Sequence, residues 1–319
     1  MIRSIFLRTV AALLVGVLLL FVGMTPGGQY DVRDPAACVT HFTVLSDAHI
    51  EGNNFPRYQV FARAMQDVKK NQSGNAAVVF LGDSTMNGKV IENLLFYGTV
   101  RAFLKNENML PVVGNHDIGN GEDDYETLQN RWYTFTEAFF GLKLTQPYYC
   151  ININGCCYIM LGTESQEVNE MCISEAQFAW LEEILWYAED TGRPAFVFSN
   201  YPTDDVVDEN GNPTDRLTMM LTDYNKTNDL FCFVGHTHMP LSFHNDGFPE
   251  IYLPRLTELG GEDDREPTSH TGVGLEVEAY DTEVVLRARD FYRGEWKYDA
   301  ADETMLEVTY PLKNPVTVQ

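Results

Sequence analysis

Blocks of apolar and polar residues alternate along the chain from Val39 onward, and their lengths predict strands and helices in turn. Short, nearly continuous apolar runs are typical of buried strands, whereas apolar residues spaced three and four apart indicate amphipathic helices. The alternation of the two element types predicts one α/β domain. The predicted strands are 41–46, 76–81, 109–113, 148–153, 157–161, 195–199, 231–234, 272–280 and 283–291, and the first two helices are 56–69 and 89–104.

Two further helices carry more specific signals. Aromatic and aliphatic residues recur at intervals of three and four from Tyr125 to Phe139 and stop at Gly141, which is typical of a helix that buries one face. Core packing is favoured over a substrate platform for this row, because the row lies on a single helical face. Ser174 and Gln177 form the pattern of an N-terminal capping box for the next helix.

Composition narrows the class of partner. The chain has 319 residues, of which 46 are acidic and 22 are basic, so its formal net charge is −24 at pH 7. Such a surface repels a phosphate backbone, and no run of Lys and Arg offsets the repulsion. Duplex nucleic acid is therefore excluded as a partner. An anionic substrate would need local positive charge, which bound divalent metal ions can supply.

The first residues predict export. Arg3 and Arg8 precede an uncharged apolar stretch, residues 9–24, that is longer than most signal-peptide cores and slightly shorter than a typical membrane span. Residues 1–28 are therefore predicted to be a signal peptide or an N-terminal membrane anchor, with membrane association through residues 9–24. Residues 29–319 are predicted to form a single domain, secreted or anchored on the outer side of the cytoplasmic membrane.

Polar residues of the kinds that bind metals directly follow five predicted strands. They are Asp47 with His49, Asp83, Asn115 with His116 and Asp117, Asn200, and His236 with His238. Each group alone has an ordinary explanation as a helix cap, a turn or a surface residue. Ligands bind at the carboxyl ends of strands in α/β sheets, so five such groups at one edge together predict a common pocket.

The array D-x-H, GD, GNHD and GH-x-H resembles the calcineurin-like metallophosphoesterase superfamily over nearly everything from Val39 to Phe291. The resemblance implies a four-layer α-β-β-α sandwich with a mixed-sheet core, in which residues 29–319 are the catalytic domain of a metal-dependent phosphoric ester hydrolase. It also implies two divalent metal ions. The residues that would hold the first ion are Asp47, His49 and His238, the bridging residue is Asp83, and those that would hold the second are Asn115, Asn200 and His236.

Carboxylate and amide oxygens combined with imidazoles suit Mn, Fe, Zn or Mg ions. A bridging carboxylate holds two cations about 3.5–4 Å apart, which is the spacing used for in-line attack at phosphorus. The resemblance assigns catalytic roles to His116 and Asp117. His116 would stabilise or protonate the leaving oxygen, and Asp117 or another nearby acid would orient the imidazole of His116.

One motif departs from the family pattern, which normally has His where this chain has Asn200. An amide oxygen can bind a hard cation, but it is a weaker donor than imidazole. The alternative to an enzyme is therefore a non-catalytic metal- or phosphate-binding module of the same fold, with its second metal site weakened by Asn200.

Further departures narrow the expected substrate. Purple acid phosphatases have Tyr three residues after the bridging Asp, where this chain has Met86, and protein Ser/Thr phosphatases have Glu where this chain has Asp117. The resemblance is therefore closest to small single-domain phosphodiesterases. A small phosphodiester outside the cytoplasmic membrane is the expected substrate, ahead of a phosphomonoester. The acidic stretch 203–215 is either a specificity element beside the metals or a solvated loop.

Overall fold

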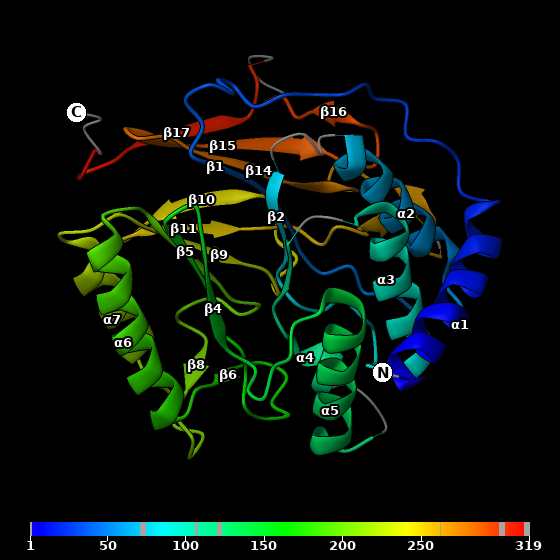
Figure 1. The fold of residues 1–319 in the computed structure, drawn as a ribbon, viewed down its shortest axis with the longest axis horizontal. Helices are drawn as coiled ribbons and strands as arrows, with labels where there is room; N and C mark the ends of the chain where they lie inside the picture. Colours follow the sequence, from blue (N-terminus) through cyan, green and yellow to red (C-terminus); the bar gives the residue numbers. More distant parts are fainter. Residues whose placement is uncertain are drawn as a thin grey trace.

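The computed structural model describes residues 2–70, 75–105, 108–119, 123–261, 263–299 and 304–315. Two β-sheets pack face to face, and helices cover both outer faces (Figure 1). The helices α1, α2 and α3 lie on one side of the molecule, and α6 and α7 lie on the other. These are the four α-β-β-α layers that the resemblance implies, so the predicted fold class is confirmed.

The first sheet has the strand order β16-β15-β14-β1-β2-β3, with β17 paired to β15. Its strands β1, β2 and β3 are parallel, and β14 to β17 extend it in antiparallel pairs. The strand bounds are β1 Thr40–Leu45, β2 Asn75–Phe80, β3 Asn108–Pro111, β14 Val273–Ala279, β15 Glu283–Asp290, β16 Glu295–Trp296 and β17 Glu307–Pro311.

The second sheet has the strand order β10-β11-β9-β7-β5-β4. Its four central strands β11, β9, β7 and β5 are parallel, and both edge strands are antiparallel to their neighbours. The bounds are β4 Tyr149–Ile153, β5 Cys156–Met160, β7 Ala195–Phe198, β9 Leu230–Val234, β10 Ser242–Asn245 and β11 Pro249–Tyr252; short two-stranded pairs are β6 Met171–Cys172 with β8 Val206–Val207 and β12 Leu259–Gly260 with β13 Glu266–Pro267.

The space between the sheets is filled by side chains from alternate positions of the strands. Phe42 of β1 meets Tyr158 of β5 and Phe196 of β7, each with ring centroids 4.9 Å apart in an edge-on arrangement. Aromatic pairs of this kind add about 0.5–1.5 kcal/mol beyond the area they bury. This packing fixes the two sheets against each other, and with them the loops at their carboxyl ends.

The helices fill the outer layers with apolar faces. α2 and α3 pack on the first sheet, and α6 packs on the second. The helix bounds are α1 Ile2–Leu19, α2 Phe55–Lys70, α3 Val90–Phe103, α4 Asn115–Ile118, α5 Tyr125–Phe135, the π-helical turn η1 Thr136–Phe140, α6 Glu175–Thr191 and α7 Arg216–Asn225. Among the described residues, no helix has the length and apolar character needed to cross a membrane.

The row from Tyr125 to Phe139 forms α5 and η1, and Gly141 ends it in a left-handed conformation with φ 81°. Leu128, Trp132 and Phe139 are buried, which confirms the core interpretation. The capping box of α6 forms only in part. Ser174 accepts from the backbone N–H of Gln177, but the side chain of Gln177 turns to Gly162, and Glu164 accepts from the backbone N–H of Ser174 at 2.7 Å.

Candidate metal centre

The five predicted groups of polar residues lie together, because the parallel strands of both sheets end at the same edge of the sandwich. Backbone hydrogen bonds tie the loops to one another. The N–H of His49 donates to the carbonyl of Asp83 at 2.8 Å, and the N–H of Gly235 donates to the carbonyl of Asn200 at 2.9 Å. One bond joins loops of the two sheets: the N–H of His236, after β9, donates to Asp47 Oδ2, after β1, at 3.2 Å.

Asp47, His49, Asp83 and His238 form the tightest group, with ligand atoms that all lie within 4.8 Å of one another. Asp47 Oδ1 is 3.5 Å from His49 Nε2 and 3.4 Å from His238 Nε2, and those two nitrogens are 2.9 Å apart. The three atoms therefore surround one small volume. This is the set predicted to hold the first ion and to bridge to the second.

The residues predicted for the second ion lie beside that group. His236 Nδ1 is 3.0 Å from Asn115 Oδ1. The amide nitrogen of Asn200 donates to the carbonyl of Leu81 at 2.8 Å. A carbonyl can only accept, so this bond turns the amide oxygen of Asn200 the other way. That oxygen lies close to Asp83 Oδ1, since both are among the three atoms nearest to the position that a methyl group on Gly114 would take.

Three oxygens in this centre are buried and make no hydrogen bond in the described structure. They are Asp47 Oδ1, Asp83 Oδ2 and Asn200 Oδ1. A buried polar atom without a partner costs about 1–3 kcal/mol, and more when it is charged. Oxygens of this kind, next to neutral imidazoles, are the donor set that divalent Mn, Fe, Zn or Mg binds. The residues therefore fit a metal centre.

The backbone of these loops is strained at the predicted ligands. Asp47, His49, Asp83, His236 and His238 all have positive φ, from 43° to 63°. Within the described ranges, only two other non-glycine residues share this conformation. Non-glycine residues rarely adopt it, and each instance costs of order 1–3 kcal/mol. Concentration of strain at five candidate ligands indicates a site where the local structure serves binding rather than stability.

Burial sets the charge states of the metal-free centre. It lowers the pKa of His49 to about 3, which keeps that imidazole neutral and able to bind a cation. It raises the pKa of Asp83 well above the usual value, with help from the charges of Asp47 and Asp117. Burial acts in the same direction on Asp47, but its contacts with His238 and His49 outweigh burial and hold the pKa low.

His116 and Asp117 differ in their surroundings. His116 Nδ1 is 2.9 Å from the carbonyl of Met86, which places the proton on Nδ1 and leaves Nε2 as the other polar atom of the ring. Asp117 accepts from the N–H and hydroxyl of Thr85 at 3.0 and 2.9 Å and from the N–H of Gly114 at 3.2 Å. These bonds lock the loops after β2 and β3 together, whereas orientation of His116 by Asp117 stays a prediction.

Two residues near the centre escaped the sequence reasoning. Arg255 follows β11 in a loop that is tied to the first motif, since the N–H of Leu256 donates to the carbonyl of Ser46 at 2.9 Å. Its guanidinium pairs with Glu258 at 2.8 Å. The ring of Tyr201 lies 4.6 Å from that of His236. Tyr201 directly follows Asn200 and could have been noticed, but Arg255 follows a short strand with no strong pattern.

The acidic stretch 203–215 is an ordered loop. Asp208 accepts from the backbone N–H groups of Asn210 and Asn212 at 2.8 and 2.9 Å, which is a local turn of the expected kind. Thr203 anchors the start of the stretch by donating to Glu250. These contacts favour the loop interpretation, and a role in specificity stays a prediction.

The sequence matches the family model of the calcineurin-like phosphoesterases over residues 40–240. The chain therefore belongs to the calcineurin-like phosphoesterase family, as the motifs predict. A search of the curated proteins finds no match.

Solved structures share the fold at low sequence identity. A dimetal phosphatase from Danio rerio is 16% identical, with 80% of this chain and 97% of that chain covered and a TM-score of 0.55. The purple acid phosphatase PPD1 from yellow lupin is 12% identical, with 85% and 53% covered and a TM-score of 0.56. GAP50, the anchor in the inner membrane complex of Plasmodium, is 10% identical, with 87% and 89% covered and a TM-score of 0.52. At these identities the likeness shows the fold. The family and the Asp/His cluster support a phosphoric ester hydrolase that can bind metal.

Proposed function

We propose that this protein is a dinuclear metal-dependent phosphoesterase that hydrolyses small phosphodiesters, and phosphomonoesters less readily, outside the cytoplasmic membrane. The observation that carries the proposal is the convergence of five strand-end loops on one buried group of carboxylate, amide and imidazole donors. A solved structure of the same fold is called a dimetal phosphatase, which supports two ions rather than one.

Each residue of the centre has a distinct task in this proposal. Asp47, His49 and His238 would hold the first ion and Asp83 would serve both. The residues that would hold the second ion are Asn115, Asn200 and His236. Divalent ions in this centre supply Lewis acidity toward a phosphoryl group and make a water molecule acidic enough to attack near neutral pH.

The chain itself holds and orients the reacting groups. His116 faces the same space as His49, with ring centroids 4.5 Å apart. The carbonyl of Met86 accepts from Nδ1 and fixes the orientation of its ring, and we assign Nε2 to the leaving oxygen. In this proposal the ring reacts as an imidazolium with a proton on each nitrogen. Nε2 donates its hydrogen to that oxygen as the ester bond breaks, and the ring, whose pKa burial lowers, is left neutral with its remaining proton on Nδ1. Met86 occupies the position at which purple acid phosphatases have a tyrosine. This difference favours the phosphodiesterases of the family over the purple acid phosphatases.

The test is hydrolysis of bis-p-nitrophenyl phosphate and of p-nitrophenyl phosphate by the full chain with Mn, Mg or Zn. We expect metal-dependent turnover, faster on the diester, and a loss of about 10²–10³-fold in Asp83→Asn, as for removal of a main electrostatic contributor. Asp223→Asn is the matched control, because Asp223 is exposed on α7 and pairs only locally with Lys226. Equal turnover in wild type and Asp83→Asn would refute the mechanism.

The rival is a non-catalytic module that holds one ion. The geometry of Asn200 argues for the enzyme, since its oxygen is turned toward Asp83 and makes no hydrogen bond in the described structure. About two ions per chain with turnover would support the enzyme, and one ion or none without turnover would support the module. Location outside the membrane is tested separately, by protease treatment of intact cells that carry the tagged full chain. A protected domain would contradict export.

A further inference from the structure

The outer face of α1 and of the turn after it is strongly apolar and exposed. Its large side chains, between 59% and 80% exposed, are those of Ile5, Phe6, Leu13, Val17, Leu20, Phe21 and Met24. Phe6, Leu13 and Val17 are spaced by seven and four, which places them along one side of the helix, and Leu20, Phe21 and Met24 follow its end at Leu19. A contiguous apolar stripe of this kind marks an interaction surface rather than ordinary surface variation.

The opposite face of α1 is fixed to the domain. A methyl group on Gly98 of α3 would lie 2.9 Å from the Cβ atom of Ala11 and 3.1 Å from Val15, so the two helices are in close contact. Arg8 donates through Nε to the carbonyl of Ala138, and Ser4 donates to the same carbonyl at 3.4 Å. The helix is thus part of the folded domain, and the apolar stripe is held in a defined orientation.

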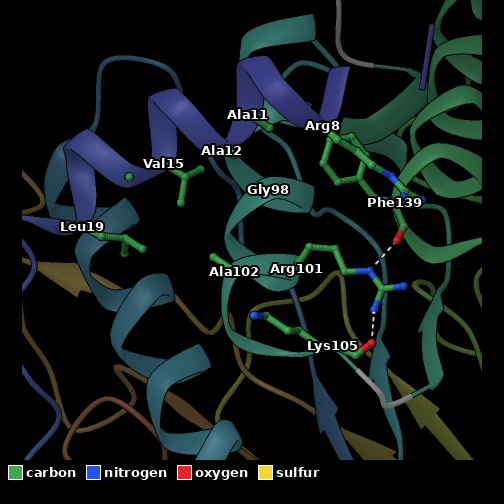
Figure 2. A pocket seen from close by; sticks show the side chains of 11 residues that line it. Arg8, Ala11, Ala12, Val15, Leu19, Gly98, Arg101, Ala102, Lys105 and Phe139 are labelled. Carbon is green, nitrogen blue, oxygen red and sulfur yellow. Dashed lines mark hydrogen bonds between the residues drawn. The ribbon is translucent and has the colours of Figure 1, made fainter. Parts of the chain in front are cut away.

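A groove of about 400 Å³ runs between α1 and α3 (Figure 2). Its floor is apolar, with Ala11, Val15 and Leu19 of α1 facing α3 and Phe139 at one end. Basic residues stand at its rim: Arg8 from α1, and Arg101 and Lys105 from the end of α3. Arg101 is held there by bonds to the carbonyls of Phe139 and Lys105. An apolar channel with a cationic rim matches an acyl chain that ends in an anionic headgroup.

The layer of helices α1, α2 and α3 has a charge of opposite sign to that of the whole chain. The segments 1–28, 55–70 and 90–105, which contain α1, α2 and α3, carry eight basic residues and two acidic ones. The complete chain carries 22 basic residues and 46 acidic ones. A layer of positive charge on an acidic protein is attracted to an anionic membrane, whose field acts on basic residues near the surface at about 1 kcal/mol each.

We propose that α1 docks this protein on the surface of a bilayer that contains anionic phospholipids. The helix lies in the plane of the interface with its apolar stripe among the lipids, and the groove beside it takes an acyl chain whose headgroup contacts the basic rim. Two positively charged layers repel each other, so a second copy of this chain does not fit the same face. The proposal does not depend on the hydrolase activity.

The experiment is flotation of the full chain with preformed vesicles of phosphatidylcholine alone or with roughly a third phosphatidylglycerol. We expect binding to the anionic vesicles that weakens with added salt. Leu13→Glu and, separately, Val17→Glu should each reduce binding by about tenfold or more, because a charge enters the apolar stripe. Lys105→Gln should reduce it about fivefold, as expected for one lost basic residue.

Met219→Glu is the matched control, since Met219 is 63% exposed and belongs to α7, a helix on the other side of the molecule from α1 (Figure 1). This variant should bind vesicles like the wild type. Circular dichroism checks that each variant is folded. Three outcomes would overturn the proposal: equal binding of wild type and both α1 variants, binding that resists both salt and alkaline carbonate as a spanning helix would, or a dimer in solution that Leu13→Glu dissolves while vesicles bind nothing.

Discussion

Asp83→Asn should stabilise the metal-free protein while it removes the metal centre. Asp83 is fully buried, accepts one backbone hydrogen bond from His116 at 2.8 Å, and leaves its second oxygen without a hydrogen bond in the described structure. It also lies near two other carboxylates, Asp47 and Asp117, whose charges add to burial in raising its pKa. Asn keeps the acceptor for His116 and tolerates the local φ of 46°, but it carries no charge.

The magnitude follows from the cost of the orphaned oxygen. Because burial raises the pKa of Asp83, folding near neutral pH must either bury its charge or take up a proton, and Asn requires neither, so the variant should recover about 1–3 kcal/mol of the free energy of unfolding. For a domain of this size each kcal/mol raises Tm by about 2–4 °C. Metal reverses the order, because ligand at 100 times its Kd adds about 2.7 kcal/mol to the wild type. The variant that has lost the bridging carboxylate gains less.

The assay is thermal unfolding of wild type, Asp83→Asn and the exposed control Asp223→Asn, each in chelator and in saturating Mn²⁺. We expect the two unfolding curves of wild type and Asp83→Asn to exchange places on addition of metal. A metal-free Asp83→Asn protein that is less stable than the wild type would show that the carboxylate is satisfied without metal, and the reasoning would be wrong.

Three further predictions concern single positions. Asn200→His should bind Mn²⁺ or Zn²⁺ at the second site about tenfold more tightly in a competition assay with a chelator, because imidazole is the stronger donor; unchanged affinity would mean that position 200 is not a ligand. Gly114→Ala should lower bound metal in elemental analysis, since its methyl group would overlap Asp83 and Asn200 oxygens, whereas Gly28→Ala, which meets nothing within 4 Å, should not. Arg289→Met should cost about 3–5 kcal/mol in chemical unfolding by stranding the buried partner Asp67, and Asp67→Leu in the same chain should restore much of it; additive losses would contradict the pairing.

Most residues of the candidate metal centre could be predicted from the sequence. An apolar run shows where a strand ends, and the ends of parallel strands lie at one edge of the sheet. Each strand ends two to four residues before a ligand group, as Leu45 precedes Asp47 and Phe80 precedes Asp83, and parallel pairing of β1 with β2 brings their ends to one edge. Asp47, Asp83 and His238 were identified by this rule, and the structure places them within reach of a single ion.

The parts that escaped prediction depend on contacts between distant residues. β11 is only Pro249–Tyr252 and has no strong apolar run, so the loop that brings Arg255 to the centre was not visible. Gln177 occupies the position of a capping-box residue, yet its side-chain amide donates to the carbonyl of Gly162. The backbone N–H of Ser174, which a capping box would pair with Gln177, donates to Glu164 instead. The orientation of the Asn200 amide likewise depends on the carbonyl of Leu81, which lies 119 residues away in the chain.

Residues 1–28 are predicted to be a segment distinct from the catalytic domain, and the structure shows how the helix of this segment, α1, lies against that domain. The sequence predicts a signal peptide or a membrane anchor for residues 1–28. α1 packs on α3 through Ala11 and Val15 and presents its other face outward. A helix that is apolar on every face is expected to be buried on every face. The sequence alone does not show which face is buried by protein and which by lipid.

The central claim is that five strand-end loops hold two metal ions for phosphoester hydrolysis. The most direct test is to measure bound Mn²⁺ per chain by equilibrium dialysis and turnover of bis-p-nitrophenyl phosphate on the same samples, for wild type and Asp83→Asn. The account predicts about two ions per wild-type chain, turnover that rises as the second ion binds, and loss of both in the variant. One ion or none with no turnover, or full turnover in Asp83→Asn, would contradict it.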